Sequence, residues 1–186
     1  MADPTPTLDA TVGGTDSNSY VTLAEANTYF GASANNGEWD SNSDPYKQVA
    51  LIQATQWLDP ITWSGKCCSD TQRLNWPRKE VTCFCREAVC TTIPLQVKQA
   101  TFELALKLAA NPNVITGGTE APDSQQGSVR RNKLGDLEQE FFEYKEGESS
   151  KVSLSGPAVL QRFPFLVDML GCWYAGNRRE IRLYRN

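Results

Sequence analysis

The segment of residues 93–112 constrains the fold more than any other part of the sequence. Its apolar residues recur at steps of three and four, which is the spacing of one face of an α-helix. That face consists of Val97, Thr101, Leu104, Ala105 and Leu108, and it is widened by Phe102, Leu106 and Ala109. Lys98, Glu103 and Lys107 leave only a narrow polar strip. A helix that is apolar around most of its girth must be covered by other elements, so we expect a central helix around which the rest of the chain packs.

Prolines and a capping motif locate the ends of this helix and the start of another. Pro94 suits the first helical turn, because its missing N–H would be unpaired there, and Pro112 closes the far end. Thr22 and Glu25 have the spacing of a capping box, in which each side chain satisfies a backbone N–H of the other residue. This motif predicts a helix that runs to about Phe30.

Two further helices are predicted from similar signals. Asp44 is placed as an N-cap in front of Pro45, and this helix is expected to run through Leu58. Pro164 opens a short helix that ends at about Cys172. The buried residues are expected to be Val49, Ile52, Ala54, Thr55, Trp57 and Leu58 in the first of these helices, and Phe165, Leu166, Met169 and Leu170 in the second.

A β-hairpin ribbon is predicted at about residues 129–144. Two strand-like runs, 129–134 and 137–144, flank the pair Gly135-Asp136, which has the composition of a two-residue hairpin turn. The fold class is therefore mainly α: a small helical bundle around one central helix, with a β-hairpin ribbon and extended N- and C-terminal arms. The expected organisation is a flexible arm at 1–18, a helical domain at 19–175 and a docking tail at 176–186.

The aperiodic segment 60–93 contains most of the cysteines of the chain. A loop this long is usually functional or pinned, and we expect Trp63 and Trp76 to pin it by covering helix ends. Three states of the cysteines remain open: free thiols, which are favoured, one or two disulfides, or a metal site. The residues that would ligate a metal are Cys67, Cys68, Cys83 and Cys85, although their spacing is not that of a zinc ribbon.

Composition excludes several classes of function. The net charge of -4 and the pI near 5.0 disfavour non-specific nucleic-acid binding, which needs clustered cations. The chain has no histidine, which removes the Ser/His and Cys/His catalytic arrangements, and it has no phosphate-binding Gly-rich motif. We therefore expect no enzymatic activity and no cofactor. No window is long and apolar enough to span a bilayer, and no secretory signal is visible, so a cytoplasmic product is expected.

An ordered set of motifs resembles a known family. The motifs are residues 19–30 (SYVTLAEANTYF), 47–58 (KQVALIQATQWL), 72–78 (QRLNWPR), 93–94 with 97–100 and 103–105, the ribbon residues 133–137 (KLGDL), and the pair Phe163-Pro164. Together they resemble the head-to-tail connector proteins of tailed bacteriophages, also called adaptor or head-completion proteins. Members of this family often carry the label DnaT-like single-stranded DNA-binding protein. The resemblance covers most of residues 19–175, and the loop cysteines depart from it.

The resemblance implies a structural role in the virion. The implied assembly is a ring of about twelve copies beneath the portal, formed in the host cytoplasm and located at the head-tail junction. Such a ring extends the DNA channel and contacts the portal protein, neighbouring copies and a tail or nozzle protein. Double-stranded DNA would pass through the channel without specific binding, and no membrane contact is implied.

Three groups of residues are predicted to make these contacts. The channel-lining residues are Glu138, Glu140 and Glu143 on the ribbon, because an acidic wall lets DNA slide. The inter-subunit residues are Phe141, Phe142 and Tyr144, whose rings need covering. The portal-binding residues are Arg178, Arg179, Ile181, Arg182, Leu183, Tyr184 and Arg185 in the C-terminal tail, where arginines lack acidic neighbours.

Two alternatives use the same sequence differently. A single-stranded DNA-binding or replication-accessory protein would combine a basic groove with stacking aromatics. Here Trp57, Trp63, Trp76 and Phe102 lie among apolar neighbours and are predicted to be core. A small metal-binding protein built on the cysteine loops is the third hypothesis.

Overall fold

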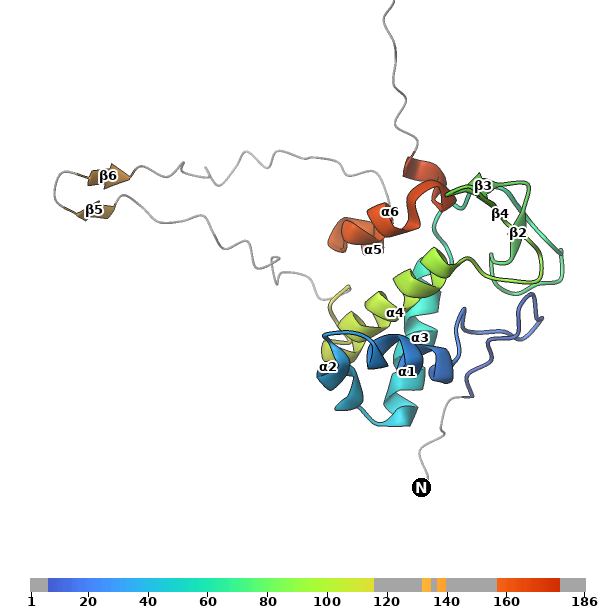
Figure 1. Cartoon of the computed structure of the whole chain (residues 1–186), viewed down its shortest axis with the longest axis horizontal. Helices are drawn as coiled ribbons and strands as arrows, with labels where there is room; N and C mark the ends of the chain where they lie inside the picture. Colours follow the sequence, from blue (N-terminus) through green and yellow to red (C-terminus); the bar gives the residue numbers. More distant parts are fainter. Residues whose placement is uncertain (1–6, 116–131, 135–136, 140–156, 178–186) are drawn as a thin grey trace, which may run out of the picture. The chain divides into compact units, whose positions relative to one another are not determined.

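A computed structural model describes residues 7–115, 132–134, 137–139 and 157–177 (Figure 1). The chain divides into two units, one of residues 1–115 with 156–186 and one of residues 116–155. The larger unit contains α1 (Leu23–Gly31), α2 (Asn36–Asp40), α3 (Asp44–Leu58), α4 (Leu95–Ala110), α5 (Ala158–Arg162) and α6 (Phe165–Leu170), followed by the 3₁₀ helices η1 (Gly171–Trp173) and η2 (Ala175–Asn177). The prediction of a mainly helical protein is confirmed. Within the described residues, no helix has both the length and the apolar character needed to cross a bilayer.

Helix α4 is the predicted central helix of the larger unit. It begins directly after Pro94, and every apolar position assigned to its face is buried. Helices α3 and α6 pack against it, and α2 contacts it as well (Figure 1). Leu95, in the first turn, is 53% exposed, so the start of α4 is the one part of the helix with a large apolar side chain at the surface.

Helix α1 follows its predicted boundaries. Thr22 caps it, the capping box with Glu25 is complete, and the helix ends at Gly31. Glu25 also accepts a hydrogen bond from Lys98 at 2.5 Å, which joins the start of α1 to α4. Tyr29 adds a second joint between the two helices, because its hydroxyl donates to Glu103 at 2.7 Å. Burial and this carboxylate neighbour raise the pKa of Tyr29 to about 12.

Helix α3 differs from the prediction in its cap and in its buried face. Ser43, with extended backbone, is the N-cap, and Asp44 is the first helical residue. The buried series is Lys47, Ala50, Leu51, Ala54, Thr55 and Leu58, whereas Val49, Ile52 and Trp57 are only partly buried. The series runs without a break at steps of three and four, and α4 covers it, so the packing partner selected this face over its apolar neighbours.

The C-terminal helix is also modified. The predicted helix from Pro164 stops at Leu170, where Gly171 takes a positive φ of 54°, and η1 completes the turn. Leu166 and Leu170 are buried as predicted, but Phe165 is 38% exposed and does not face the core. Leu166 and Leu170 are four residues apart and share the inward face of this short helix, and Phe165 lies at the edge of that face.

Residues 7–18, assigned by composition to a flexible arm, form a hydrogen-bonded loop. The backbone N–H groups of Asn18 and Ser19 donate to the carbonyl of Asp9. The side-chain oxygen of Asn18 in turn accepts a hydrogen bond from the backbone N–H of Asp9. Arg73 holds the loop from outside by donating from its backbone N–H to the carbonyl of Gly14. Polar turn residues predicted flexibility here, but their side chains instead satisfy the backbone locally.

Three two-stranded antiparallel sheets complete the described structure. Strands β1 (Lys66–Cys67) and β2 (Arg78–Lys79) form the first, and β3 (Thr82–Cys83) and β4 (Arg86–Glu87) form the second. Sequence periodicity gave no signal for these two, because each strand has only two residues. The third pairs β5 (Asn132–Leu134) with β6 (Leu137–Gln139) in the smaller unit, across the predicted turn 135–136. The other ribbon residues lie outside the described ranges.

Asp59, at the C-terminal end of α3, connects three segments. Its carboxylate accepts a hydrogen bond from the hydroxyl of Tyr20 and another from the backbone N–H of Asn75 at 2.6 Å. Its carbonyl accepts from the indole of Trp63 at 3.0 Å and from the amide of Asn75 at 2.9 Å. Burial and the Asp59 charge raise the pKa of Tyr20 well above its ordinary value. The N-terminal segment, α3 and the 60–93 loop are therefore held at one point.

The double role of Glu25 gives a pH dependence. Burial opposes its ionisation, but the hydrogen bonds from Lys98 and Thr22 outweigh burial and hold the pKa of Glu25 below its ordinary value of 4.5. A lowered pKa in the folded state contributes stability above pH 4.5 that is lost as pH falls through the folded value. Glu25→Gln, which keeps a capping acceptor, should cost about 0.5 kcal/mol near pH 7 and flatten the acid side of the stability profile.

Urea unfolding of the wild type and the variant between pH 3 and 7 measures this effect. Lys98→Met is the matched control, since it removes the ion pair and leaves the capping box. An unchanged acid profile in Glu25→Gln would exclude Glu25 as its source.

Candidate functional site

Most of the predicted contact residues lie outside the described ranges. These are Glu140, Phe141, Phe142, Glu143, Tyr144, Arg178, Arg179, Ile181, Arg182, Leu183, Tyr184 and Arg185. Glu138 lies in β6 opposite Lys133 in the strand register. The described residues therefore test none of the three predicted groups, and these groups remain predictions.

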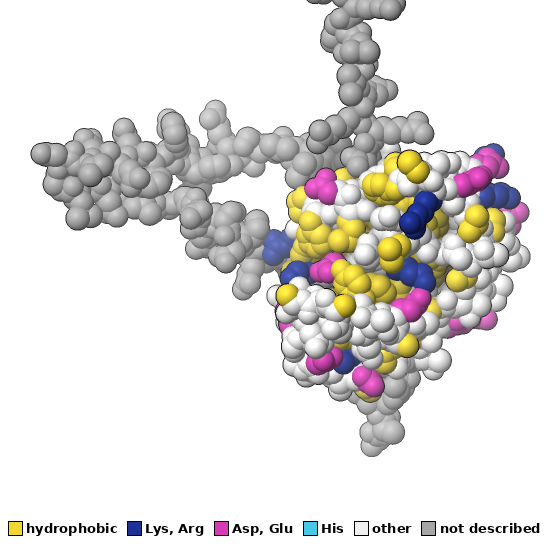
Figure 2. All heavy atoms as spheres, in the orientation of Figure 1, with side chains coloured by type: hydrophobic (Ala, Val, Ile, Leu, Met, Phe, Trp, Pro, Cys, Tyr) yellow, Lys and Arg dark blue, Asp and Glu magenta, His cyan; other side chains and the backbone are white. Residues whose placement is uncertain are grey.

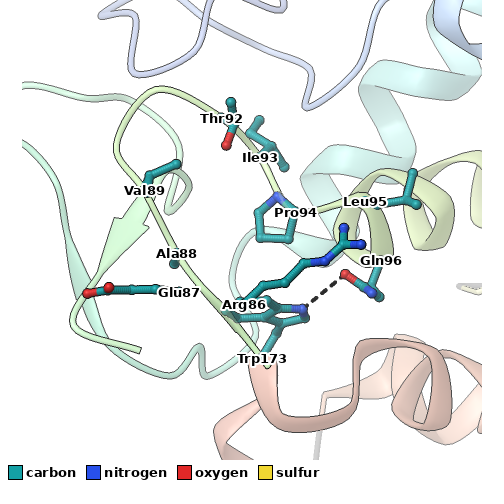
Figure 3. Close-up of a pocket in the computed structure, with 10 residues that line it drawn as sticks. All are labelled: Arg86, Glu87, Ala88, Val89, Thr92, Ile93, Pro94, Leu95, Gln96 and Trp173. Carbon is teal, nitrogen blue, oxygen red and sulfur yellow. Dashed lines mark hydrogen bonds between the residues drawn. The ribbon is translucent and has the colours of Figure 1, made fainter. Parts of the chain in front are cut away.

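The described residues contain a different candidate, a pocket between the β3–β4 hairpin and the start of α4 (Figure 3). Its volume is about 210 Å³, and it is lined by Arg86, Glu87, Ala88, Val89, Thr92, Ile93, Pro94, Leu95, Gln96 and Trp173. Val89 is 49% exposed and Leu95 is 53% exposed on its rim. We refer to this pocket with its two rim residues as the hairpin face. Its lining mixes apolar side chains with one cation and one carboxylate, which is the composition of a contact surface.

Three tryptophans support the hairpin face from behind. The ring of Trp76 meets the rings of Trp63 and Trp173 edge to face, each with a centroid distance of 5.5 Å. Trp173 donates from its indole N–H to Gln96 at 3.3 Å, which ties the floor of the pocket to α4 (Figure 3). All three rings are buried, as predicted for Trp63 and Trp76. No pattern in the sequence relates Trp173 to this cluster, because it lies almost one hundred residues after Trp76.

Two disulfides fix the segment that carries the hairpin. Cys68 pairs with Cys90, and Cys83 pairs with Cys172, with Cα–Cα distances of 5.6 Å in both bridges. Cys67 and Cys85 are free and exposed. Of the three states left open, two disulfides with two free thiols is the observed one. The four cysteines considered as metal ligands are thereby divided between separate bridges and free thiols, and no group of three potential ligands occurs among the described residues.

The turn of the β3–β4 hairpin has an unusual backbone. Phe84 and Cys85 connect the paired residues Cys83 and Arg86, and both have positive φ, 51° and 60°. Positive φ at both central residues is the pattern of a type I′ turn, which normally selects Asn and Gly. A non-glycine residue there costs on the order of 1–3 kcal/mol, so other contacts must hold this turn.

Several cations among the described residues of the larger unit are bonded to other groups of the chain. Lys47 is buried between Asp40 and Asp44 and lies over the ring of Trp39, and Lys66 pairs with Glu80 at 2.6 Å. The guanidinium of Arg78 is buried and donates to backbone carbonyls and to the sulfur of Cys67. The face of the molecule in Figure 2 accordingly shows acidic and basic side chains interspersed among hydrophobic ones, without a continuous basic stripe.

A family model described as “Putative DnaT-like ssDNA binding protein” matches residues 7–185. The chain belongs to this family. The match spans nearly the whole chain, including the cysteine-rich loop and both segments around the ribbon. Searches of curated proteins and of solved structures gave no match. Family membership agrees with the label that the resemblance carries, and the functional assignment is taken up below.

The tryptophans allow a matched test of packing. Trp76 is 1% exposed, and its indole nitrogen has no hydrogen-bond partner among the described residues, whereas buried Trp39 donates to Asn27 at 2.8 Å. Trp76→Phe should cost only the lost ring volume, about 1–2 kcal/mol of unfolding free energy. Trp39→Phe should cost about 1 kcal/mol more, because it also leaves the side-chain oxygen of Asn27 without its hydrogen-bond donor.

Urea denaturation midpoints of the two variants, with the disulfides intact, provide the comparison. Trp76→Ala is the reference for full loss of the ring and should cost about 3–5 kcal/mol. A larger loss in Trp76→Phe than in Trp39→Phe would show that the Trp76 N–H is bonded after all.

Proposed function

We propose that the protein is a structural virion component, a head-to-tail connector that forms a ring adaptor between the portal and the tail of a tailed phage. In this role it extends the DNA channel and has no enzymatic activity. The proposal starts from the ordered motifs at 19–30, 47–58 and 72–78, and it applies to the assembled particle rather than to the free chain.

The observation that carries the proposal is the internal use of aromatic rings and cations. Trp39, Trp63, Trp76 and Trp173 are all buried, so they offer no surface on which bases could stack. The cations of Lys47, Lys66 and Lys98 are paired with carboxylates. A surface with these properties suits a subunit that contacts other proteins and lets DNA pass without holding it.

The contacts in the ring are assigned as follows. Neighbouring copies, about twelve in a cyclic arrangement, meet through the ribbon residues Phe141, Phe142 and Tyr144. Glu138, Glu140 and Glu143 line the channel, and the tail residues 178–185 bind the portal. The hairpin face adds a fourth contact, and its mixture of apolar and charged side chains suits a tail or nozzle protein.

The second candidate is single-stranded DNA binding, and the description of the matching family favours it. Such binding requires exposed aromatics beside a basic groove. Among the described residues, the exposed large aromatics are Tyr46, Phe84 and Phe165, and Arg162 at the end of α5 precedes Phe165 at the start of α6. Three scattered rings and a net charge of -4 make this the weaker proposal.

The connector proposal predicts the behaviour of a tail deletion. Removing residues 178–186 should leave the far-ultraviolet circular dichroism unchanged, since η2 ends at Asn177, and should abolish attachment to portal-bearing heads. Replacement of the four tail arginines by lysine is the control, because it keeps the charge and loses bidentate pairing. Mass spectrometry of purified particles gives the copy number per head. Unchanged attachment of the deleted chain would remove the portal-binding role.

The two candidates also differ in DNA affinity. We expect the purified protein to bind a labelled oligothymidine only in the non-specific range, about 1–100 μM at physiological salt. Fluorescence anisotropy over a salt series measures this affinity. Nanomolar binding that weakens steeply with salt, together with quenching of tryptophan emission, would overturn the connector proposal in favour of the second candidate.

A further inference from the structure

The turn at Phe84 and Cys85 needs a reason for its conformation, because neither residue favours positive φ. The hairpin itself offers little support. It has two residue pairs, Thr82 with Glu87 and Cys83 with Arg86, and one further backbone bond from the N–H of Ala88 to the carbonyl of Val81. A ribbon of this length is marginal in water, so its geometry must be imposed from outside.

Two contacts with η1 impose it. Cys83, the residue before the turn, is 2% exposed and is bonded to Cys172. The ring of Phe84 lies against Gly171, where an added Cβ would come within 2.5 Å of the ring. Two consecutive hairpin residues, Cys83 and Phe84, are therefore held by two consecutive residues of η1, Cys172 and Gly171.

We infer that the Cys83–Cys172 disulfide is a redox-controlled element that holds the Phe84–Cys85 turn in its left-handed conformation and thereby assembles the hairpin face. The same element reaches the pocket directly, because Trp173 follows Cys172 in η1 and forms the floor of the pocket. Arg86 and Glu87, on the strand after the turn, also line the pocket, and Arg86 lies beside Trp173 (Figure 3). With the bridge open, the hairpin and η1 lose the cross-link between them.

The chemistry of opening is a thiol–disulfide exchange. A dithiol reductant gives two electrons and two protons to the bridge, both cysteines become thiols, and the reductant becomes a cyclic disulfide. Cys172 is exposed, so the reductant has access from that side although Cys83 is buried. A chain made in a reducing compartment would carry the open form, and an oxidising medium would close it.

The test compares the two disulfides of the same chain. Cys83→Ser with Cys172→Ser removes the controlling bridge, and Cys68→Ser with Cys90→Ser is the matched control. Amide hydrogen exchange of residues 82–88 is measured in both variants by mass spectrometry. We expect exchange of residues 82–88 to accelerate at least about tenfold more than exchange of α3 and α4 in the first variant, and by no more than exchange of α3 and α4 in the control.

A rescue variant tests the role of the turn itself. Phe84→Asn with Cys85→Gly places a favoured type I′ pair at the positive-φ positions. Added to the Cys83→Ser, Cys172→Ser background, it should restore most of the lost protection without restoring the bridge. Gly171→Ala, with both bridges intact, should displace the Phe84 ring and raise its exposure, which limited chymotrypsin cleavage after Phe84 reports.

Three results would overturn the inference. Equal acceleration in both double variants would show general loosening of the 60–93 loop. Unchanged exchange in the Cys83→Ser, Cys172→Ser variant would show that the turn holds itself. Failure of the Asn-Gly pair to restore protection would show that the bridge acts elsewhere. None of these measurements involves a portal, a ring or DNA, so the outcome is independent of the proposed function.

Discussion

The carboxylate of Asp59 is the interaction on which the larger unit most depends. Three segments meet there: the segment before α1 at Tyr20, the C-terminal end of α3, and the loop at Asn75. Asp59 is partly buried, and a carboxylate in such a place is costly to leave without its hydrogen-bond donors, so the three segments depend on one another through it. Tyr20, which donates to this carboxylate, makes stability depend on pH on the alkaline side. Its raised pKa gives stability that is complete below pH 10 and is lost as pH rises above it, because only the unfolded chain releases the proton there.

The Asp59 network and the tryptophan cluster share a residue, and this sharing divides the unit into two kinds of structure. Trp63 donates to the carbonyl of Asp59 and packs on Trp76, which in turn packs on Trp173. On one side of these rings lies the α3–α4 core, which is stabilised by burial of apolar side chains. On the other side lies the hairpin, which has two-residue strands, mostly exposed side chains and a disulfide at its buried Cys83. Local stability should therefore fall across the cluster.

The sequence predicted the parts of the fold that depend on local or periodic signals. The wide apolar surface of α4 and the capping box of α1 are of this kind, and both predictions are confirmed. Selection of the buried face of α3 depends on which helix covers it, and the loop at 7–18 depends on Asp9 and Asn18 meeting. The first depends on a separate helix, and the second depends on a contact between residues nine apart that no periodicity signals. The hairpin face is a stronger case, because it combines Arg86, Leu95 and Trp173, which no spacing relates. The number and spacing of the cysteines left three states open: free thiols, disulfides or a metal site. Two disulfides are observed, and their pairing depends on which cysteines the fold brings together.

The long Cys83–Cys172 bridge also bears on how one chain can carry two units. Its sequence separation of 89 residues encloses α4, the whole of residues 116–155, α5 and α6. In the chain-entropy model, closing a loop of that length in the unfolded state is equivalent to about 4–5 kcal/mol of stabilisation. The bridge thus holds η1, which contains the buried Trp173, beside β3, although residues 116–155 lie between the two cysteines in the sequence.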